Sequence, residues 1–371
     1  MVRAGDIIIS EPGEGESGLP DIFVNEVLET LPMSEMTDNF NTQRDWETLT
    51  YTGYGEGIRV GVGDTGVDKT HMEGDLKGTI ARDFTGSRNG FYDVHSHGTH
   101  TTMHIGARKD GKGFFGAAFN STLFHAKVLG DRGSGSTRGI ADGIKWMVDQ
   151  GCLLINLSLG GGFSRDIEAA LVYAQDNGCI PFASMGNSGN RGDGHPGNSR
   201  YSQGITAMDY NHRLASFSSR SNMAKYVGYG VQVLSGVTGG RYGRMSGTSM
   251  SCPDTVGQAA IQLGYMKKLG LTLPKTVAQY DALVEGCIKD LGPEGHDRGY
   301  GLGFIITKRV LEKIKAMAGD PPPEEPQPAP TLNLGLGAVL SDDGILFFSG
   351  NGEEATLTVG DKTYKGNVSS L

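Results

Sequence analysis

The sequence predicts an α/β fold in which a mostly parallel central sheet is flanked by helices. Apolar, strand-like runs alternate along the chain with stretches of helical periodicity, an order that implies βαβ crossovers. One run, residues 152–159, is almost continuously apolar and is typical of a strand buried on both faces. The 371 residues suffice for a large core, and 59 glycines supply many tight turns.

The first half of the chain carries most of the predicted sheet. Apolar residues alternate up to Asp64, and a second alternating run precedes a Gly/Ser turn. In order, we predict strand 58–63, strand 123–129, helix 137–149, strand 152–159, helix 165–177 and strand 180–184. Functional side chains are expected at the carboxyl ends of these strands.

The second half is predicted to be more helical. Apolar residues recur at helical spacing after Ser249, which predicts a helix to about residue 268 whose apolar stripe belongs to the core. Further helices are expected near 275–289 and 307–318.

Composition divides the chain into four predicted parts. The N-terminal arm is rich in Gly, Glu and Pro and then holds a short helix broken at Pro32. It is either a disordered lead-in with a strap across the core, or a short inhibitory pro-segment that makes the chain a zymogen. The parts are the arm (1–45), the main domain (46–318), a stiff proline-rich linker (319–330) and a small β-rich appendage (331–371).

Charge and apolar content argue against several classes of partner. The net charge is −9 and the basic residues are scattered, which argues against nucleic acid. No apolar run reaches the length of a membrane span, and three isoleucines near the N-terminus are too few for a secretory signal. We therefore expect a cytoplasmic or intracellular protein. The cysteines are expected to be reduced and buried: Cys152, Cys179, Cys252 and Cys287.

An aspartate and a histidine are the first two candidates for a functional site. Asp64 follows the first strand in the run GDTG, which also caps turns and occurs in aspartic proteases, although the second copy that those enzymes need is absent. His97 lies in the run HSHGTH. The spacing of His97 and His100 would allow both side chains to bind a zinc ion, but no HExxH motif or well-placed carboxylate accompanies them.

A serine and an asparagine complete the set of candidates. Ser249 follows Gly247 at the start of a helix, where unpaired amides favour developing negative charge; an ordinary helix cap is the alternative. Asn187 comes directly after a buried strand and could donate to an oxyanion, or it is simply a turn residue.

Taken together, these segments resemble the subtilase family of subtilisin-like serine proteases. The matches are GDTG at 63–66, HGTH at 97–100 and GTSM at 247–250, in the family's Asp, His, Ser order. Further likeness is found in KVL (127–129), SLGG (158–161), GN (186–187), ASFSS (215–219) and GYGL (299–302). The resemblance covers about residues 45 to 315 and implies a three-layer subtilisin-like fold.

The resemblance implies a serine endopeptidase that hydrolyses peptide bonds through an acyl-enzyme. Ser249 would attack the scissile carbonyl, His97 would transfer the proton, and Asp64 would hold the imidazole. Asn187 and the amide of Ser249 would form the oxyanion hole, and no cofactor would be required.

The substrate would be a protein or peptide bound as an extended strand. The residues on its two sides would be Gly133, Ser134 and Gly135, and Ser158, Leu159 and Gly160. Gly194 would leave the main specificity pocket open to large apolar or aromatic side chains.

Three departures from the family carry expectations. Asp254 replaces a histidine that usually packs behind the nucleophile, so the local pH dependence is expected to differ. The segment 108–114 lacks the loop that holds a tight calcium ion in many subtilisins, so the resemblance does not imply calcium dependence. Calcium as a structural ion stays open, with Asp68 as a candidate ligand. Cys252 has no assigned base, so we expect a buried thiol rather than a second nucleophile.

Two other functions stay open. The chain could be a catalytically silent protein-binding module with the same fold, against which the intact candidate residues argue. It could instead be a peptide ligase or cyclase that uses the same acyl-enzyme, but no large insertion near His97 or Ser249 could exclude water. The C-terminal appendage is expected to bind a partner, to anchor the chain or to be removed.

Overall fold

A computed structural model describes most of the main domain and short parts of the two ends. The described residues are 29–31, 52–71, 76–109, 114–319, 340–341, 344–345, 355–359 and 362–366. The chain separates into two compact units, Met1–Gly319 and Asp320–Leu371.

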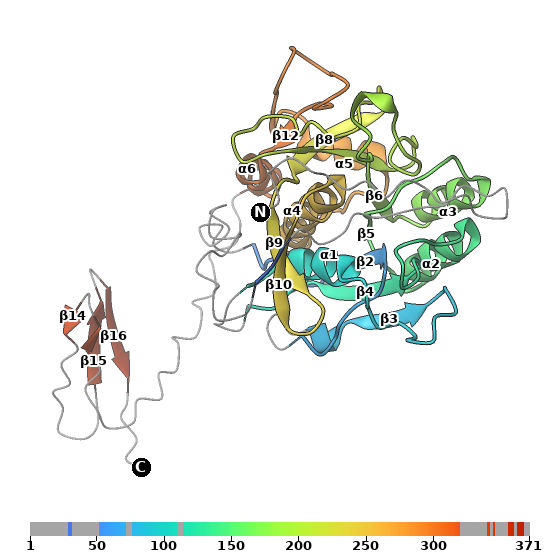
Figure 1. Cartoon of the computed structure of the whole chain (residues 1–371). Helices are drawn as coiled ribbons and strands as arrows, with labels where there is room; N and C mark the ends of the chain where they lie inside the picture. Colours follow the sequence, from blue (N-terminus) through green and yellow to red (C-terminus); the bar gives the residue numbers. More distant parts are fainter. Residues whose placement is uncertain are drawn as a thin grey trace, which may run out of the picture. The chain divides into compact units, whose positions relative to one another are not determined.

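The larger unit is built on a seven-stranded parallel sheet with the strand order β3-β4-β2-β5-β6-β7-β8 (Figure 1). The strands are β2 (Arg59–Asp64), β3 (Ile80–Asp83), β4 (Thr122–Lys127), β5 (Leu154–Leu157), β6 (Ile180–Ser184), β7 (Gln203–Met208) and β8 (Ala224–Tyr229). This arrangement confirms the predicted α/β class. The first predicted strand, β2, lies between β4 and β5, so its carboxyl end at Asp64 has a neighbouring strand on each side.

Helices cover both faces of the sheet and give three layers. They are α1 (His97–Gly106), α2 (Thr137–Asp149), α3 (Arg165–Asp176), α4 (Thr248–Lys268), α5 (Val277–Val284) and α6 (Thr307–Met317). Val60 and Val62 of β2 belong to the apolar core that contains α1 and α4, whereas α2 and α3 share a second core. The intervening Gly61 faces α2, where an added Cβ would lie 2.6 Å from the sulfur of Met147. The alternation in the first strand therefore lets a helix pack closely on each side.

Serine and threonine side chains start three of these helices. Ser136 accepts a hydrogen bond from the Gly139 amide at α2, and Ser164 accepts one from the Ile167 amide at α3. Thr276 does the same for α5. Each bond satisfies an amide that the first helical turn leaves unpaired.

The predicted helix at 275–289 is shorter than expected. It ends at Val284, because Gly286 adopts a left-handed conformation with φ of 77°, and β11 (Ile288–Lys289) then pairs with β12 (Phe304–Ile305). A helix was also predicted around Pro32. The described residues of that region, Glu29–Leu31, instead form strand β1, and the rest of 1–51 lies outside the described residues.

Strand β1 extends a small antiparallel sheet. It pairs with β10 (Arg241–Met245), which in turn pairs with β9 (Val233–Val237). Strand β10 precedes α4 directly along the chain, so the N-terminal arm contacts the segment that leads to Ser249. Whether the arm is a strap or a pro-segment stays a prediction.

The smaller unit contains two short hairpins among its described residues. Strand β13 (Leu340–Ser341) pairs with β14 (Gly344–Ile345), and β15 (Ala355–Val359) pairs with β16 (Lys362–Gly366). The predicted proline linker lies outside the described residues, apart from Gly319.

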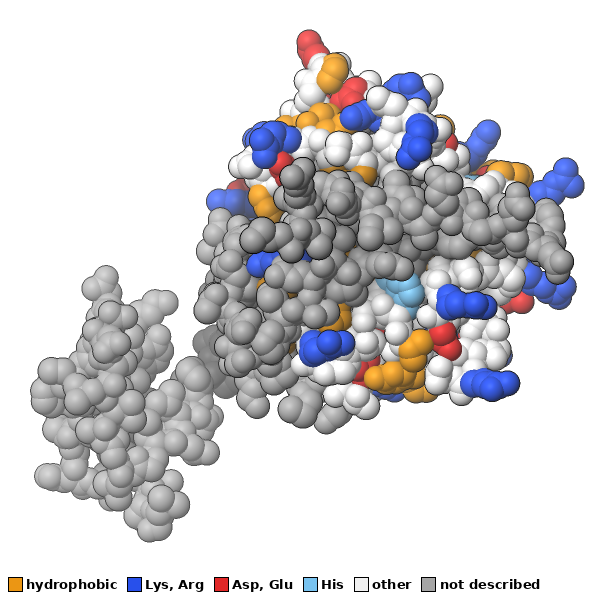
Figure 2. Space-filling view, in the orientation of Figure 1, with side chains coloured by type: hydrophobic (Ala, Val, Ile, Leu, Met, Phe, Trp, Pro, Cys, Tyr) orange, Lys and Arg blue, Asp and Glu red, His pale blue; other side chains and the backbone are white. Residues whose placement is uncertain are grey.

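The surface and the helices add two observations. Figure 2 shows Lys and Arg side chains scattered over the visible face of the described residues rather than gathered in one patch. Among the described residues, no helix has the length and apolar content needed to cross a membrane.

Candidate active site

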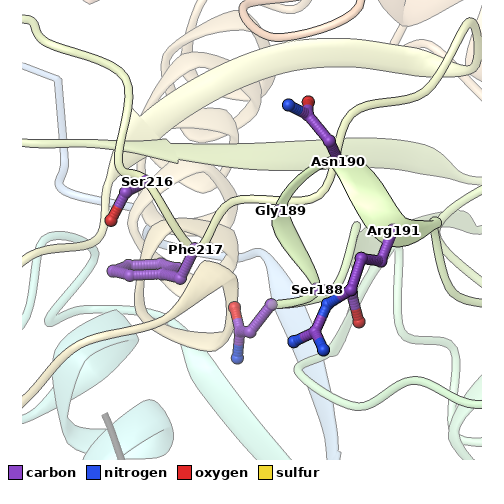
Figure 3. A pocket seen from close by; sticks show the side chains of 7 residues that line it. Ser188, Gly189, Asn190, Arg191, Ser216 and Phe217 are labelled. Carbon is purple, nitrogen blue, oxygen red and sulfur yellow. The ribbon is translucent and has the colours of Figure 1, made fainter. Parts of the chain in front are cut away.

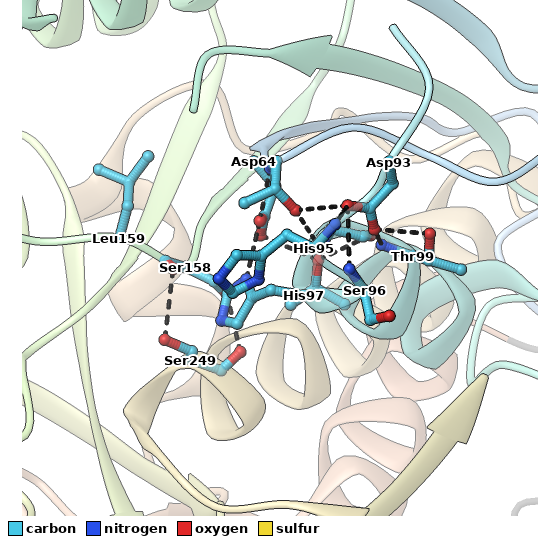
Figure 4. A network of polar contacts seen from close by, with 12 residues as sticks. Asp64, Asp93, His95, Ser96, His97, Thr99, Ser158, Leu159 and Ser249 are labelled. Atoms are coloured by element: carbon cyan, nitrogen blue, oxygen red, sulfur yellow. Dashed lines mark hydrogen bonds and ion pairs between the residues drawn. The ribbon is translucent and has the colours of Figure 1, made fainter. Parts of the chain in front are cut away.

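The sheet brings Asp64 and His97 together. Asp64 is the last residue of β2 and His97 the first of α1, and both side chains are fully buried. His97 Nδ1 lies 2.7 Å from Asp64 Oδ1. A carboxylate only accepts hydrogen bonds, so this contact places a ring proton on Nδ1 and directs Nε2 to the opposite edge of the imidazole. Figure 4 shows the His97 ring between Asp64 and Ser249.

The surroundings of Asp64 favour its ionised form. Burial alone would raise the pKa of the carboxyl, but the charge interaction and hydrogen bond with His97, together with smaller contributions from neighbouring groups, hold the pKa below its usual value. The Thr65 amide donates to Oδ1 at 2.7 Å, and Thr101 Oγ1 donates to Oδ2 at 3.1 Å. Both carboxylate oxygens are therefore fixed by α1 and by the turn after β2.

A second buried carboxylate, Asp93, organises the entry to α1. Its Oδ1 accepts from Thr65 Oγ1 at 3.0 Å and from the Ser96 amide at 3.0 Å, while its Oδ2 accepts from the Thr99 amide at 2.8 Å. Ser96 stands in the left-handed region with φ of 81°. Thr65 Oγ1 also accepts from the Gly98 amide at 2.8 Å. Asp93 thus locks the histidine loop to the aspartate turn (Figure 4).

Ser249 is the second residue of α4 and is 4% exposed. Its Oγ donates to the carbonyl of Ser158 at 3.2 Å, and Ser158 Oγ donates to the carbonyl of Ser249 at 2.8 Å. Pro253 has no N–H, so the helix cannot supply the usual donor to the Ser249 carbonyl four residues earlier. Ser158, just after β5, satisfies that carbonyl and ties the serine to the sheet.

Asn187 lies against the first residue of α4. Its Oδ1 accepts from the Thr248 amide at 2.9 Å and from Thr248 Oγ1 at 3.0 Å. A backbone amide can only donate, so the oxygen must face Thr248 and the amide nitrogen Nδ2 must face away from it. Among the described residues, Nδ2 has no hydrogen-bond partner, which leaves it available to donate to a ligand.

The residues predicted to flank a substrate follow β4 and β5, the two strands on either side of β2. The turn after β4 is closed by a bond from the Gly130 amide to the Ser134 carbonyl, and an added Cβ at Gly135 would lie 2.2 Å from the carbonyl oxygen of Val128. Ser158 and Leu159 are buried after β5. Beside them, Gly161 pairs with His195 in an isolated bridge.

Gly194 immediately precedes that bridge. A Cβ added to it would lie 3.5 Å from the Gly161 amide nitrogen, so any side chain at 194 would occupy the space beside Gly160 and Gly161.

A pocket of about 300 Å³ adjoins Asn187 (Figure 3). It is lined by Asn187, Ser188, Gly189, Asn190, Arg191, Ser216 and Phe217. The Gly189 amide donates to the Phe217 carbonyl at 2.7 Å, which joins the two loops that form the pocket. Arg191 is the one charged residue of this lining and makes no ion pair with the described residues.

His100 and Cys252 are buried structural groups. His100 Nε2 lies 3.0 Å from the carbonyl of Val233, and burial, with the charges of neighbouring histidines, lowers its pKa to about 3. Cys252 is fully buried, which raises the pKa of its thiol far above neutral pH. A thiol in that state is a poor nucleophile.

The structure shows the contacts of Asp254 and Asp68, the two further aspartates for which the sequence raised an expectation. Asp254 faces His104 of α1 across the interface with α4, with 3.8 Å between Oδ1 and Nε2 and both side chains 1% exposed. Asp68 is held by protein donors, since Oδ1 accepts from the amide and hydroxyl of Thr70 and Oδ2 from Tyr92 and the Gly239 amide. Among the described residues no group of three or more His, Cys, Asp or Glu could hold a metal ion.

Sequence reasoning missed three residues around this site. Asp93 and Thr248 orient predicted residues; Thr248 lies inside the GTSM motif but had no assigned role, and Asp93 lies just before the HSHGTH run. His125 lies in β4, fully buried, and donates and accepts hydrogen bonds behind Asp64. The signal that could have drawn attention to it was a histidine within a predicted strand, although the sequence does not show its partner.

Comparison with known proteins shows the family. Residues 55–303 match the Subtilase family, so the chain belongs to the subtilases. It is 36% identical over 211 residues to the "Thermostable alkaline protease" of Halalkalibacterium halodurans, covering 56% of this chain and 57% of that protein. It is 35% identical over 208 residues to Subtilisin Savinase of Lederbergia lenta, covering 56% of this chain and 76% of that protein.

A third relative gives the same picture. The chain is 34% identical over 218 residues to Subtilisin E of Bacillus subtilis, covering 57% of each protein. The chain thus spans only a little over half the length of several relatives that it matches.

Proposed function

We propose that the chain is a serine endopeptidase that hydrolyses peptide bonds through an acyl-enzyme. The observation that carries the proposal is the buried 2.7 Å contact between His97 and Asp64, with Ser249 on the other side of the imidazole (Figure 4). The protease names of the relatives support the same chemistry. Hydrolysis of a chromogenic peptide, together with labelling of Ser249 by a fluorophosphonate, tests it.

In the proposed reaction, the Ser249 hydroxyl turns from the Ser158 carbonyl toward His97 Nε2. As Oγ bonds to the scissile carbonyl carbon, Nε2 takes the hydroxyl proton and the Asp64 carboxylate stabilises the imidazolium. The proton then passes to the nitrogen of the leaving amine as the peptide bond breaks. Water attacks the acyl-enzyme by the same route and restores the serine.

Two donors are proposed to stabilise the negative oxygen of the tetrahedral intermediate. One is Asn187 Nδ2, whose orientation Thr248 fixes, and the other is the Ser249 amide in the first turn of α4. Developing charge at a helix start gains from the unpaired amides there.

Asn187→Ala is expected to lower kcat by about 10²–10³ with little change in KM, a magnitude known from a subtilisin. The donor acts on charge that exists only in the transition state, so ground-state binding is spared. Asn177→Ala, at the exposed end of α3 and outside this pocket, is the matched control and should keep wild-type kcat. An effect of Asn187→Ala confined to KM would contradict the assignment.

The substrate is proposed to be an extended protein or peptide strand. Its acyl half would pair with the backbone near Gly133–Gly135 and Ser158–Gly160, and the open space at Gly194 would accept a large apolar or aromatic side chain before the cut. The pocket in Figure 3 shares Asn187 with this path but none of the residues that hold the acyl half. We therefore assign it to the residues after the cut.

Arg191 is expected to favour an acidic residue in one of the first two positions after the cut. Peptides that differ only there should be cleaved about 2- to 5-fold faster with Asp or Glu than with Lys, as for an exposed charge pair. Arg191→Glu should reverse the order, whereas Arg138→Glu, at an exposed position of α2, should not. The ratio of kcat/KM values measures the effect, and identical ratios in all three proteins would refute it.

Two other functions predict different results. A silent binding module would bind peptides but would not react with the fluorophosphonate. A ligase or cyclase would transfer the acyl group to an added amine in preference to water, which mass spectrometry of the products detects. Calcium as a structural ion, an intracellular location and a partner for the appendage remain proposals.

A further inference from the structure

A buried histidine behind the Asp64–His97 pair has no part in the reaction proposed above. His125 lies on β4 and pairs in register with Val62 of the neighbouring β2. Its side chain is fully buried. A polar ring in such a place costs free energy unless its nitrogens are hydrogen-bonded, so its contacts show what the ring does.

Both nitrogens of His125 are bonded to the elements that carry the pair. The Gly66 amide donates to Nε2 at 3.2 Å, and Nδ1 lies 2.9 Å from Thr102 Oγ1. An amide only donates, so Nε2 carries no proton and Nδ1–H must donate to Thr102. Thr102 Oγ1 then donates to the carbonyl of Gly98 at 2.6 Å. The bonds form one directed chain from the aspartate turn to the first turn of α1.

The charge state agrees with this chain of bonds. Burial and then the nearby Lys127 lower the pKa of His125, against the opposing influence of Asp64, to about 4. The ring is therefore neutral near pH 7. Protonation would place a hydrogen on Nε2, where it would face the donating amide of Gly66.

We infer that His125 is a positioning residue that holds Asp64 and His97 at their working distance. The inference rests on the proposed endopeptidase function. Gly66 follows Asp64 by two residues and Gly98 follows His97 by one, so the chain of bonds links the backbone beside each member of the pair. The two segments also touch, since a Cβ at Gly98 would lie 2.2 Å from the Gly66 carbonyl oxygen. The hydrogen bonds of His125 stabilise this contact from strand β4.

The test compares His125→Phe with Thr102→Val. The first keeps a ring of similar shape but removes the acceptor for Gly66, and the second removes the hydroxyl in the middle of the chain. His125→Phe is expected to lower kcat about 10-fold or more with KM nearly unchanged, because small displacements of reacting groups are costly. Thr102→Val should give a smaller fall, and the double variant should lose less than the product of the two.

The pH profile separates positioning from a general loss of stability. The acid limb of kcat/KM reports protonation of the base. It should move to lower pH in His125→Phe, because a less well-placed carboxylate stabilises the imidazolium less. Thr206→Val removes a buried hydroxyl that donates to the Tyr226 carbonyl in the same sheet, and it should change Tm but neither kcat nor the limb.

Several outcomes would overturn the inference. One is a folded His125→Phe with wild-type kcat and pH profile; if that variant does not fold, an unchanged Thr102→Val serves instead. Nitrogen-15 NMR of histidine-labelled Ser249→Ala gives a readout that needs no activity. It should show His125 neutral with the proton on Nδ1 near pH 7, and a proton on Nε2 would refute the bonding scheme. Inactive wild-type protein would instead refute the proposed function.

Discussion

Replacing Ser249 with alanine is expected to lower kcat by about 10⁶, a magnitude known from the same change in a subtilisin. The substitution removes the only atom that can form the acyl-enzyme in the proposed reaction. Substrate binding should survive, because the backbone edges and the pocket at Asn187 do not depend on the hydroxyl. Steady-state hydrolysis of a peptide and labelling by a fluorophosphonate measure the loss.

Ser251→Ala is the matched control for this prediction. Ser251 lies two residues further along α4, is equally buried, and donates to the carbonyl of Thr248 at 3.0 Å. Its loss should cost about 1 kcal/mol of stability and leave the turnover per folded molecule unchanged. A Ser249→Ala protein that hydrolyses peptides at the wild-type rate would end the proposal of a serine endopeptidase.

Replacing Asp64 with asparagine is expected to lower kcat by about 10⁴. The amide can present a donor to His97 Nδ1, which favours the wrong tautomer, and it carries no charge to stabilise the imidazolium. With its nitrogen toward His97, the new side chain can still accept from the Thr101 hydroxyl but no longer from the Thr65 amide, so the fold should persist with some loss of stability. Asp142→Asn, in an exposed pair with Arg138, is the control and should keep full activity.

The same carboxylate makes stability depend on pH. The pKa of Asp64 is lowered in the folded state from the ordinary value of 3.8, so its ionisation stabilises the fold above about pH 4, and this contribution is lost as the pH falls through the folded-state pKa. Urea unfolding of wild type and Asp64→Asn from pH 7 to pH 3 measures it. The difference in the free energy of unfolding should shrink toward acid pH; a difference that grows would contradict the lowered pKa.

The positions of the candidate site residues were easier to predict from the sequence than the residues that support them. Asp64 ends a strand and Ser249 lies at the start of a helix, so local sequence patterns predict both positions. The strand order places β2, which carries Asp64, next to β5, which leads to the Ser158 that contacts Ser249. His125 could not be assigned, because its partner, the Gly66 amide, is 59 residues away and is a backbone group with no sequence signal. Asp93 was hidden for a similar reason, since most of its donors are backbone amides of its own loop and of the start of α1.

The unpredicted strands have a different cause. Strand β10 reads RYGRM, with two arginines and a glycine, and it is stabilised by its neighbours β9 and β1 rather than by an apolar pattern. Helix α5 ends early because the left-handed backbone at Gly286 interrupts a sequence that still favours helix. In β10 tertiary pairing overrides local propensity, whereas α5 ends at a glycine of the kind that commonly terminates a helix.

Helix ends commonly fray, and a nucleophile carried on the first turn of a helix would be expected to share that motion. Pro253 changes this for Ser249, because it leaves the serine carbonyl to be held by Ser158 at the end of β5 instead of by the helix. The attacking group therefore inherits the rigidity of the sheet, and heating should loosen the far end of α4 well before it disturbs the point where bonds are broken.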